Sequence, residues 1–181
     1  AALFVAASES PKANSPRLNN IGQCNGGAQG SPDAQLAGCT ALIESGAESN
    51  RILAAAYNNR GNAFSKKGQY DRAIDDYNKS IKFNPEYARA YSNRGVAHYK
   101  TGDHARAIDD LTQSISLDPG YALAFANRAD AYQNAGRYDD AFRDFDEAIR
   151  LQPTMEEAWN GRCWARARVA QLEAGLADCN E

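Results

Sequence analysis

Several things that this sequence lacks narrow its function before any motif is considered. No long hydrophobic run occurs: the longest apolar stretch, residues 1–7, is far shorter than the roughly 20 residues of a membrane-spanning helix. Charge of one sign is not in excess either, because 20 lysines and arginines stand against 23 aspartates and glutamates. A net charge of -3 creates no field that would draw the chain to a phosphate backbone, so we expect neither a nucleic-acid partner nor membrane insertion.

The motifs of common enzyme chemistry are also missing. The sequence has no GxSxG nucleophile elbow, no HExxH pair, no P-loop and no dinucleotide fingerprint. Its cysteines form no CxxC pair, and its only histidines are His98 and His104, so a zinc site would have to combine distant parts of the chain. We therefore expect no enzyme activity, no catalytic residues, no metal and no cofactor.

What the sequence does contain is an internal repeat with a period of 34 residues. Three segments that start at Tyr57, Tyr91 and Phe125 align without a gap, and a partial copy starts at Trp159. Each complete copy has a small residue four positions after the aromatic residue, a glycine near its middle and a proline at its end. The glycine ends one helix and the proline ends the next, so each copy predicts a helical hairpin. Hairpins of this kind bury their apolar faces only by stacking on their neighbours.

The length and residue order of the repeat resemble the tetratricopeptide repeat family over residues 54–181. This resemblance implies an all-α fold, a right-handed superhelix of antiparallel helical hairpins. We expect three full repeats and a truncated fourth, preceded by an N-terminal capping helix. The array covers residues 51–181, with repeats at about 54–87, 88–121, 122–155 and 156–181. Because the family pattern would continue beyond Glu181, we also expect the chain to be truncated there.

Each copy departs from the family pattern by carrying an arginine where an aliphatic residue is usual, and an aspartate follows sixteen residues later. Folding a hairpin about its central glycine places these two residues opposite each other. We therefore predict ion pairs between the first and second helix of each repeat. The alternative is solvated charge pairs, each contributing well under about 1 kcal/mol. The four pairs are Arg60/Asp76, Arg94/Asp110, Arg128/Asp144 and Arg162/Asp178.

Two cysteines share this register. Cys163 and Cys179 are also sixteen residues apart, so the same fold-back brings them together and predicts a disulfide that would stabilise the last hairpin by about 3 kcal/mol. The alternative is a pair of reduced, buried thiols. Cys24 and Cys39 flank a segment in which Ser31 predicts a helix N-cap, and a bond between them would tie the N-terminal chain to that helix.

The N-terminal region divides into two parts by composition. Residues 1–23 are a signal-peptide remnant or a disordered tether, and the Pro, Asn, Gly and Ser content up to residue 30 predicts loop or extended chain. Residues 24–50 hold the N-terminal segment and the capping helix. Two cysteine pairs favour an oxidising compartment, and the arrangement resembles exported alphaproteobacterial tetratricopeptide repeat proteins. That resemblance implies a periplasmic or secreted bacterial location.

In the tetratricopeptide repeat family the first helices of successive hairpins line a concave groove that contacts a ligand. Asn59, Asn93 and Asn127 recur there at the repeat period, and amide side chains can pair with the backbone of an extended peptide. Alternatively, these amides bond adjacent helices to one another. The complete set of expected groove residues is Asn58, Asn59, Asn62, Arg89, Asn93, Tyr99, Lys100, Asn127, Asp130 and Trp164.

These patterns predict a protein–protein interaction scaffold that binds an extended peptide or partner protein in the groove. Family members that bind acidic chaperone tails use lysines at positions that here hold Asn58, Ser92 and Ala126, so that clamp is absent. An acidic or C-terminal peptide could still contact the other cations. The alternative function is a structural module that self-associates through its terminal helices, in particular through an exposed C-terminal end.

Overall fold

The computed structural model describes residues 16–26, 30–169 and 177–179. Within these ranges, nine α-helices and no strand make up the fold. Their bounds are α1 Pro16–Cys24, α2 Pro32–Glu44, α3 Asn50–Lys66, α4 Tyr70–Phe83, α5 Ala88–Lys100, α6 His104–Leu117, α7 Ala122–Asn134, α8 Tyr138–Leu151 and α9 Glu156–Arg168.

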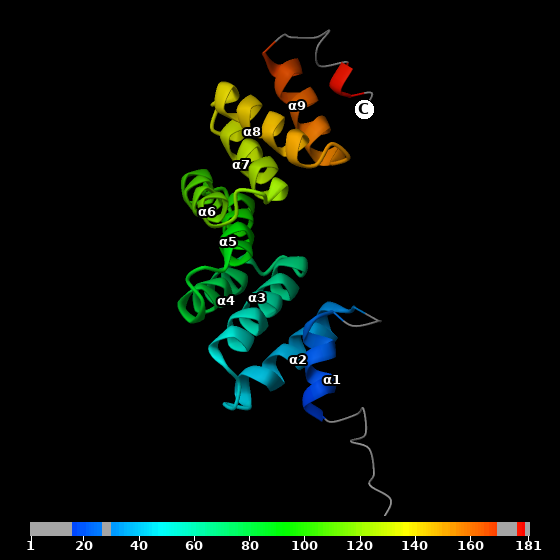
Figure 1. The fold of residues 1–181 in the computed structure, drawn as a ribbon, viewed down its shortest axis with the longest axis vertical. Coiled ribbons are helices and arrows are strands. Elements are labelled where there is room, and N and C mark those ends of the chain that lie inside the picture. The colour runs from blue at the N-terminus through cyan, green and yellow to red at the C-terminus, as the bar shows by residue number, and fades with distance from the viewer. Residues whose placement is uncertain (1–15, 27–29, 170–176, 180–181) are drawn as a thin grey trace, which may run out of the picture.

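Consecutive helices pack as hairpins that follow one another along a single long axis (Figure 1). Three of these hairpins, α3/α4, α5/α6 and α7/α8, are the three full repeats of the sequence, and α9 opens the fourth. The predicted all-α solenoid of helical hairpins is therefore confirmed. The turn inside each full repeat ends the first helix at a glycine with positive φ, at +71° in Gly68, +85° in Gly102 and +75° in Gly136. Glycine adopts this left-handed conformation without the strain that a Cβ would add.

Small residues allow the two helices of a hairpin to approach closely. A Cβ on Gly61 of α3 would lie 2.6 Å from the Tyr77 ring of α4, so no larger residue fits there without movement of the ring. Ala73, Ala107 and Ala141, which recur at the repeat period on the second helices, are completely buried. The core of the array is thus a row of small residues interleaved with one large side chain per repeat.

The four repeat arginines bind the aspartates that the sequence pairs them with. The Nε and Nη2 atoms of Arg60 donate to the two carboxylate oxygens of Asp76, at 2.7 and 2.9 Å. The other three repeats keep this two-pronged geometry, with donor–acceptor distances of 2.6 to 3.0 Å. All four aspartates are at most 8% exposed, which contradicts the alternative of solvated pairs. The predicted pairing is confirmed.

Each arginine also uses its remaining nitrogen, Nη1, to reach the helix that precedes its own repeat. Arg94 donates to Asn78 of α4 at 2.6 Å, and Arg128 donates to Thr112 of α6 at 3.0 Å. The same contact joins Arg162 to Asp146 of α8, and Arg60 to Thr40 of α2 at 3.2 Å. In each of the three full repeats, one guanidinium therefore connects three helices: the two of its own hairpin and the one before. We call each such group a three-helix arginine contact.

The N-terminal cap differs from the expectation of loop or extended chain up to residue 30. Residues 16–24 form the helix α1, so that expectation, and the proposed tether, are wrong for this segment. Ile21 and Cys24 of α1 pack against Cys39, Leu42 and Ala56 from α2 and α3. A short polar helix gains its stability from such packing, which composition alone does not reveal. The cap is thus a hairpin of two helices; residues 1–15 lie outside the described part of the chain.

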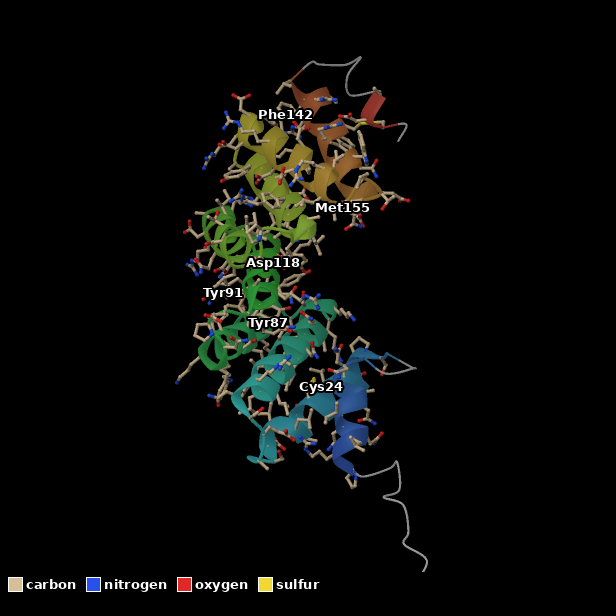
Figure 2. The ribbon with its side chains drawn as sticks, viewed as in Figure 1. Cys24, Tyr87, Tyr91, Asp118, Phe142 and Met155 are labelled. Atoms are coloured by element: carbon tan, nitrogen blue, oxygen red, sulfur yellow. A yellow bond between two sulfur atoms is a disulfide. The ribbon has the colours of Figure 1, made fainter. Side chains whose placement is uncertain are left out.

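Both cysteine pairs are joined by disulfides in the structure, consistent with the predicted pairing. Cys24 and Cys39 connect α1 to α2, with their Cα atoms 4.5 Å apart, and Figure 2 shows Cys24 where the cap meets the array. Cys163 of α9 is joined to Cys179, with a Cα–Cα distance of 5.5 Å. Covalent bonds therefore lie near both ends of the array. Among the described residues, no helix combines the length and the apolar character that crossing a membrane requires.

The three-helix arginine contacts lead to a stability prediction. Replacing Arg128 by Met should lower the free energy of unfolding by about 3 kcal/mol, because Asp144 would stay buried without its partner. Arg150 of α8 offers a matched control, since it pairs with Glu147 at the surface, where solvent screens the charges, and its replacement by Met should change stability far less. Urea unfolding followed by circular dichroism measures both; equal losses in the two variants would contradict the structural role.

The disulfides lead to a second prediction, checked by intact mass. Protein isolated from an oxidising compartment should add no alkyl group before reduction and four after it, one per cysteine. The double variant Cys24→Ser/Cys39→Ser should unfold about 3 kcal/mol more easily, because the bond closes a loop with a separation of 15 residues. Alkylation of all the cysteines without reduction would show that the bonds are absent.

Candidate functional site

The first helices of the hairpins lie next to one another, and each presents a row of side chains to the same side. Residues spaced by four, three and four positions lie along one face of a helix, and α5 contacts both α3 and α7, while α7 contacts α9. We call the resulting surface the first-helix face. It consists of Asn59, Asn62 and Lys66 of α3; Arg89, Asn93, Val96 and Lys100 of α5; Leu123, Asn127, Asp130 and Asn134 of α7; and Glu157, Trp164 and Arg168 of α9.

A pocket of about 250 Å³ opens on this face between α3 and α5. It brings together Asn62 and Asn93, two of the asparagines expected in the groove, with Val96 as an apolar wall. The hydroxyl of Tyr77, whose pKa is raised by burial, donates to the Oδ1 atom of Asn62 at 2.8 Å and so orients this amide. The full lining is Gln35, Asn62, Ser65, Lys66, Tyr77, Asn93 and Val96.

Gln35 is a pocket residue that the sequence analysis missed. It comes from α2, which lies outside the repeats, so the alignment of the repeats could not identify it. Its Nε2 atom donates to the backbone carbonyl of Cys24 at 3.2 Å, while its Oε1 atom is buried without a hydrogen-bond partner. The N-terminal cap therefore supplies part of the candidate site.

The asparagines of the first two repeats are bonded to one another. Asn93 donates to Asn58 at 2.8 Å, Asn58 donates to Asn59 at 3.3 Å, and Asn59 donates to Asn25 at 3.1 Å. This chain of amides joins α5, α3 and the end of α1, as the alternative interpretation of the asparagines anticipated. Asn58 is only 3% exposed, so its expected place among the groove residues is wrong. Asn127 of α7, in contrast, has no hydrogen-bond partner among the described residues.

A second group of predicted residues meets between α5 and α7. The Nδ2 atom of Asn134 donates to the Tyr99 hydroxyl at 2.9 Å and also to the backbone carbonyl of Asp130, at 2.9 Å. The Nζ atom of Lys100 lies 5.5 Å from the centre of the Tyr99 ring. The carboxylate of Asp130 has no hydrogen bond and no ion pair in the described chain. Burial raises the pKa of Asp130 to about 6, against the weaker opposing effect of the Lys100 charge.

Exposed apolar side chains extend the first-helix face toward the C-terminal end. Trp164 of α9 is 66% exposed and occupies the position that corresponds to Asp130 in the preceding repeat. Leu123 of α7 is also exposed. The other tryptophan, Trp159, instead donates its indole N–H to the Pro153 carbonyl at 2.9 Å. The first-helix face thus carries an unpaired carboxylate on α7, among the described residues, and an exposed indole on α9.

The described residues contain no cluster of three or more His, Cys, Asp or Glu side chains that could hold a metal ion. His98 is buried behind the Arg94/Asp110 pair, and this burial lowers its pKa. The predicted groove residues therefore offer amides, cations, one carboxylate and exposed apolar groups. These are the groups of a binding surface.

The raised pKa of Asp130 leads to a prediction about stability and pH. Because the folded state holds the carboxyl group at a pKa of about 6, above its ordinary value of 3.8, ionisation opposes folding; the penalty grows as the pH rises from 3.8 to about 6 and is constant above that. Asp130→Asn should therefore be more stable than the wild type by about 2 kcal/mol at pH 7.5, and this gain should shrink toward pH 4. Urea unfolding across this pH range tests it; a gain that does not vary with pH would contradict the assignment.

Comparisons with known proteins agree with this architecture. Residues 61–102 match the family described as TPR repeat, and residues 88–121 and 122–155 each match the family described as Tetratricopeptide repeat. The sequence matches no curated protein. The crystal structure of MamA shares the fold, with a TM-score of 0.74 at 17% identity over 92% of each chain.

Two solved tetratricopeptide repeat domains are more similar in sequence. The Arabidopsis OM64 TPR domain is 28% identical, with a TM-score of 0.65 over 66% of this chain and 99% of that domain. The second TPR domain of human RPAP3, solved in complex with the HSP70 peptide SGPTIEEVD, is 32% identical, with a TM-score of 0.63 over 65% of this chain and 98% of that domain. The repeated hairpins, the matched repeats and this degree of identity show that the chain belongs to the tetratricopeptide repeat family.

Proposed function

We propose that this protein is an interaction scaffold that binds an extended segment of a partner protein along the first-helix face. The observation that carries this proposal is the pocket between α3 and α5, where the amides of Asn62 and Asn93 meet beside the cation of Lys66. The proposal assigns no catalytic residue to the chain and requires no cofactor.

The unused hydrogen-bonding groups of the face suit a peptide backbone. Asn62 has its amide nitrogen available because only its oxygen is engaged, by Tyr77. In Asn93 only the amide nitrogen is used within the described chain, where it donates to Asn58, so the amide oxygen is available. An extended backbone presents alternating N–H and C=O groups, so one acceptor and one donor held side by side can bind it whatever its side chains.

The solved relatives support peptide binding by a domain of this kind. One human RPAP3 domain is in complex with an HSP70 peptide, and the first TPR domain of Spaghetti (RPAP3), 26% identical with a TM-score of 0.65, is bound to the HSP90 peptide SRMEEVD. The present chain covers 98% of each of these domains.

We also propose that the protein is periplasmic or secreted. Its two cysteine pairs are joined by disulfides, and such bonds form and persist in an oxidising compartment.

The exposed indole of Trp164 favours a second candidate function. Aromatic residues, tryptophan among them, are enriched where one protein chain contacts another. Trp164 lies on the last described helix of the array, so it could support self-association through the C-terminal end. Light scattering separates the two functions, because a monomer whose mass does not vary with concentration excludes self-association.

The different environments of two asparagines allow a sharp test of the proposed function. Phage display on the whole protein supplies nine-residue peptides, whose dissociation constants are then measured by fluorescence anisotropy. Asn127→Ala should weaken binding about fivefold with no change in melting temperature, since Asn127 has no partner in the described chain. Asn93→Ala should weaken binding and also lower the melting temperature, because it removes the bond to Asn58.

Gln113→Ala, on the exposed side of α6, is the matched control for these two variants and should change neither quantity. Selected peptides that bind both asparagine variants as tightly as the wild type would refute binding on the first-helix face. Failure to select any peptide would count against a peptide-binding scaffold altogether.

A further inference from the structure

We propose that Asp130 recognises a basic side chain of the bound segment, so that the partner carries a lysine or arginine where it crosses α7. This inference rests on the proposed function of the first-helix face and adds the chemistry of the residue that is recognised. It also gives the bound segment a direction.

Asp130 differs from the other buried carboxylates of the chain. Asp76, Asp110, Asp144 and Asp178 are each bonded by a repeat arginine at 2.6 to 3.0 Å, which is how this protein keeps a carboxylate inside its structure. Asp130 is partly buried on the first-helix face and has no such partner among the described residues. A charge removed from water without a partner is unfavourable, so a ligand cation is the missing counterpart.

The repeat shows that this position does not need a carboxylate. The corresponding residues are Asn62, Val96 and Trp164, so a neutral side chain serves in each of the other repeats. Burial at Asp130 disfavours the charged form, as its raised pKa indicates. Asp130 thus lowers stability at pH 7, although uncharged residues fit the same position in the other repeats. A residue that is unfavourable for stability in this way is typical of a binding site.

None of the charged groups nearby already neutralises Asp130. Lys100 of α5 forms no ion pair with it and instead lies over the Tyr99 ring. Arg168 of α9 donates to the Tyr138 hydroxyl of α8 at 3.2 Å. From α6, His104 packs against the Tyr99 ring with a centroid distance of 5.4 Å. Among the described residues, the Asp130 carboxylate thus has no cation partner.

The aromatic residues around Asp130 suit a cation as well. Tyr99 precedes it on α5, and the exposed Trp164 follows it on α9 at the corresponding position of the next repeat. The faces of aromatic rings attract lysine and arginine side chains, most strongly in the case of tryptophan.

The charges of the whole face then define an orientation for the ligand. Lys66, Arg89 and Lys100 lie on α3 and α5, Asp130 lies on α7, and α9 contributes both Glu157 and Arg168. Because opposite charges attract, the basic part of a bound segment lies against α7, and any acidic part lies against α3 and α5. The first-helix face thus favours segments whose two ends differ in charge.

Paired peptides test this inference. Nine-residue peptides selected by phage display on the whole protein at pH 7.5 should be enriched in a basic residue at one position. Replacing that residue by citrulline, or by glutamine if it is lysine, should weaken binding about tenfold in fluorescence anisotropy, because a charge-assisted hydrogen bond is lost. The preference should diminish at pH 5.0, since the carboxyl group with a pKa of about 6 is then protonated.

Two variants with the same change of charge complete the experiment. Asp130→Asn should bind the basic and neutral peptides equally at both pH values. Asp139→Asn, which removes an exposed carboxylate of α8, should keep the full preference. Selected peptides that depend on Asn127 but show no preference for a basic residue would overturn the inference and leave the scaffold function intact. A selection that yields no binding peptide would overturn both.

Discussion

The bond between a repeat arginine and its aspartate is the interaction on which the rest of this structure depends. A tetratricopeptide repeat has no sheet to hold its helices in register, and here the small residues that line the hairpins give close approach with little specificity. A guanidinium has five donors in a fixed plane, so it can bind a carboxylate with two of them and a neighbouring helix with a third. Arg128 does this with Asp144 and Thr112, and it thereby fixes both the hairpin and its position on the preceding one.

This internal use of charge determines what remains for binding. The arginines and their aspartates are satisfied within the array, so the first-helix face is left with amides, a few separate cations, the carboxylates of Asp130 and Glu157, and exposed apolar side chains. Amides such as Asn127 bind a backbone without selecting its sequence, whereas a carboxylate or an exposed indole such as that of Trp164 selects particular side chains. In the proposed function, the amides of this face give general affinity, and Asp130 and Trp164 give selectivity.

The N-terminal cap both covers the end of the solenoid and contributes to the candidate site. A terminal repeat needs a cover for its apolar side, and α1 and α2 supply it with Cys24, Cys39 and Leu42. The same hairpin carries Gln35 into the pocket beside Asn62. Because the disulfide and the Gln35 side chain both hold the end of α1 against α2, the stability of the cap and the shape of the pocket are coupled.

The sequence by itself determined the hairpins, their order and the arginine–aspartate pairs. Because the repeats align without a gap, residues that lie opposite each other in one hairpin also lie opposite each other in every other copy. It also identified Asn93 and Asp130 as residues of one face. Tertiary structure alone decided what lies outside that register: the helix α1, the contribution of Gln35, the burial of Asn58 and the unpaired state of Asp130. The physical reason is that spacing along a helix specifies the direction of a side chain, whereas its partners and its exposure to water depend on which neighbouring helix reaches it.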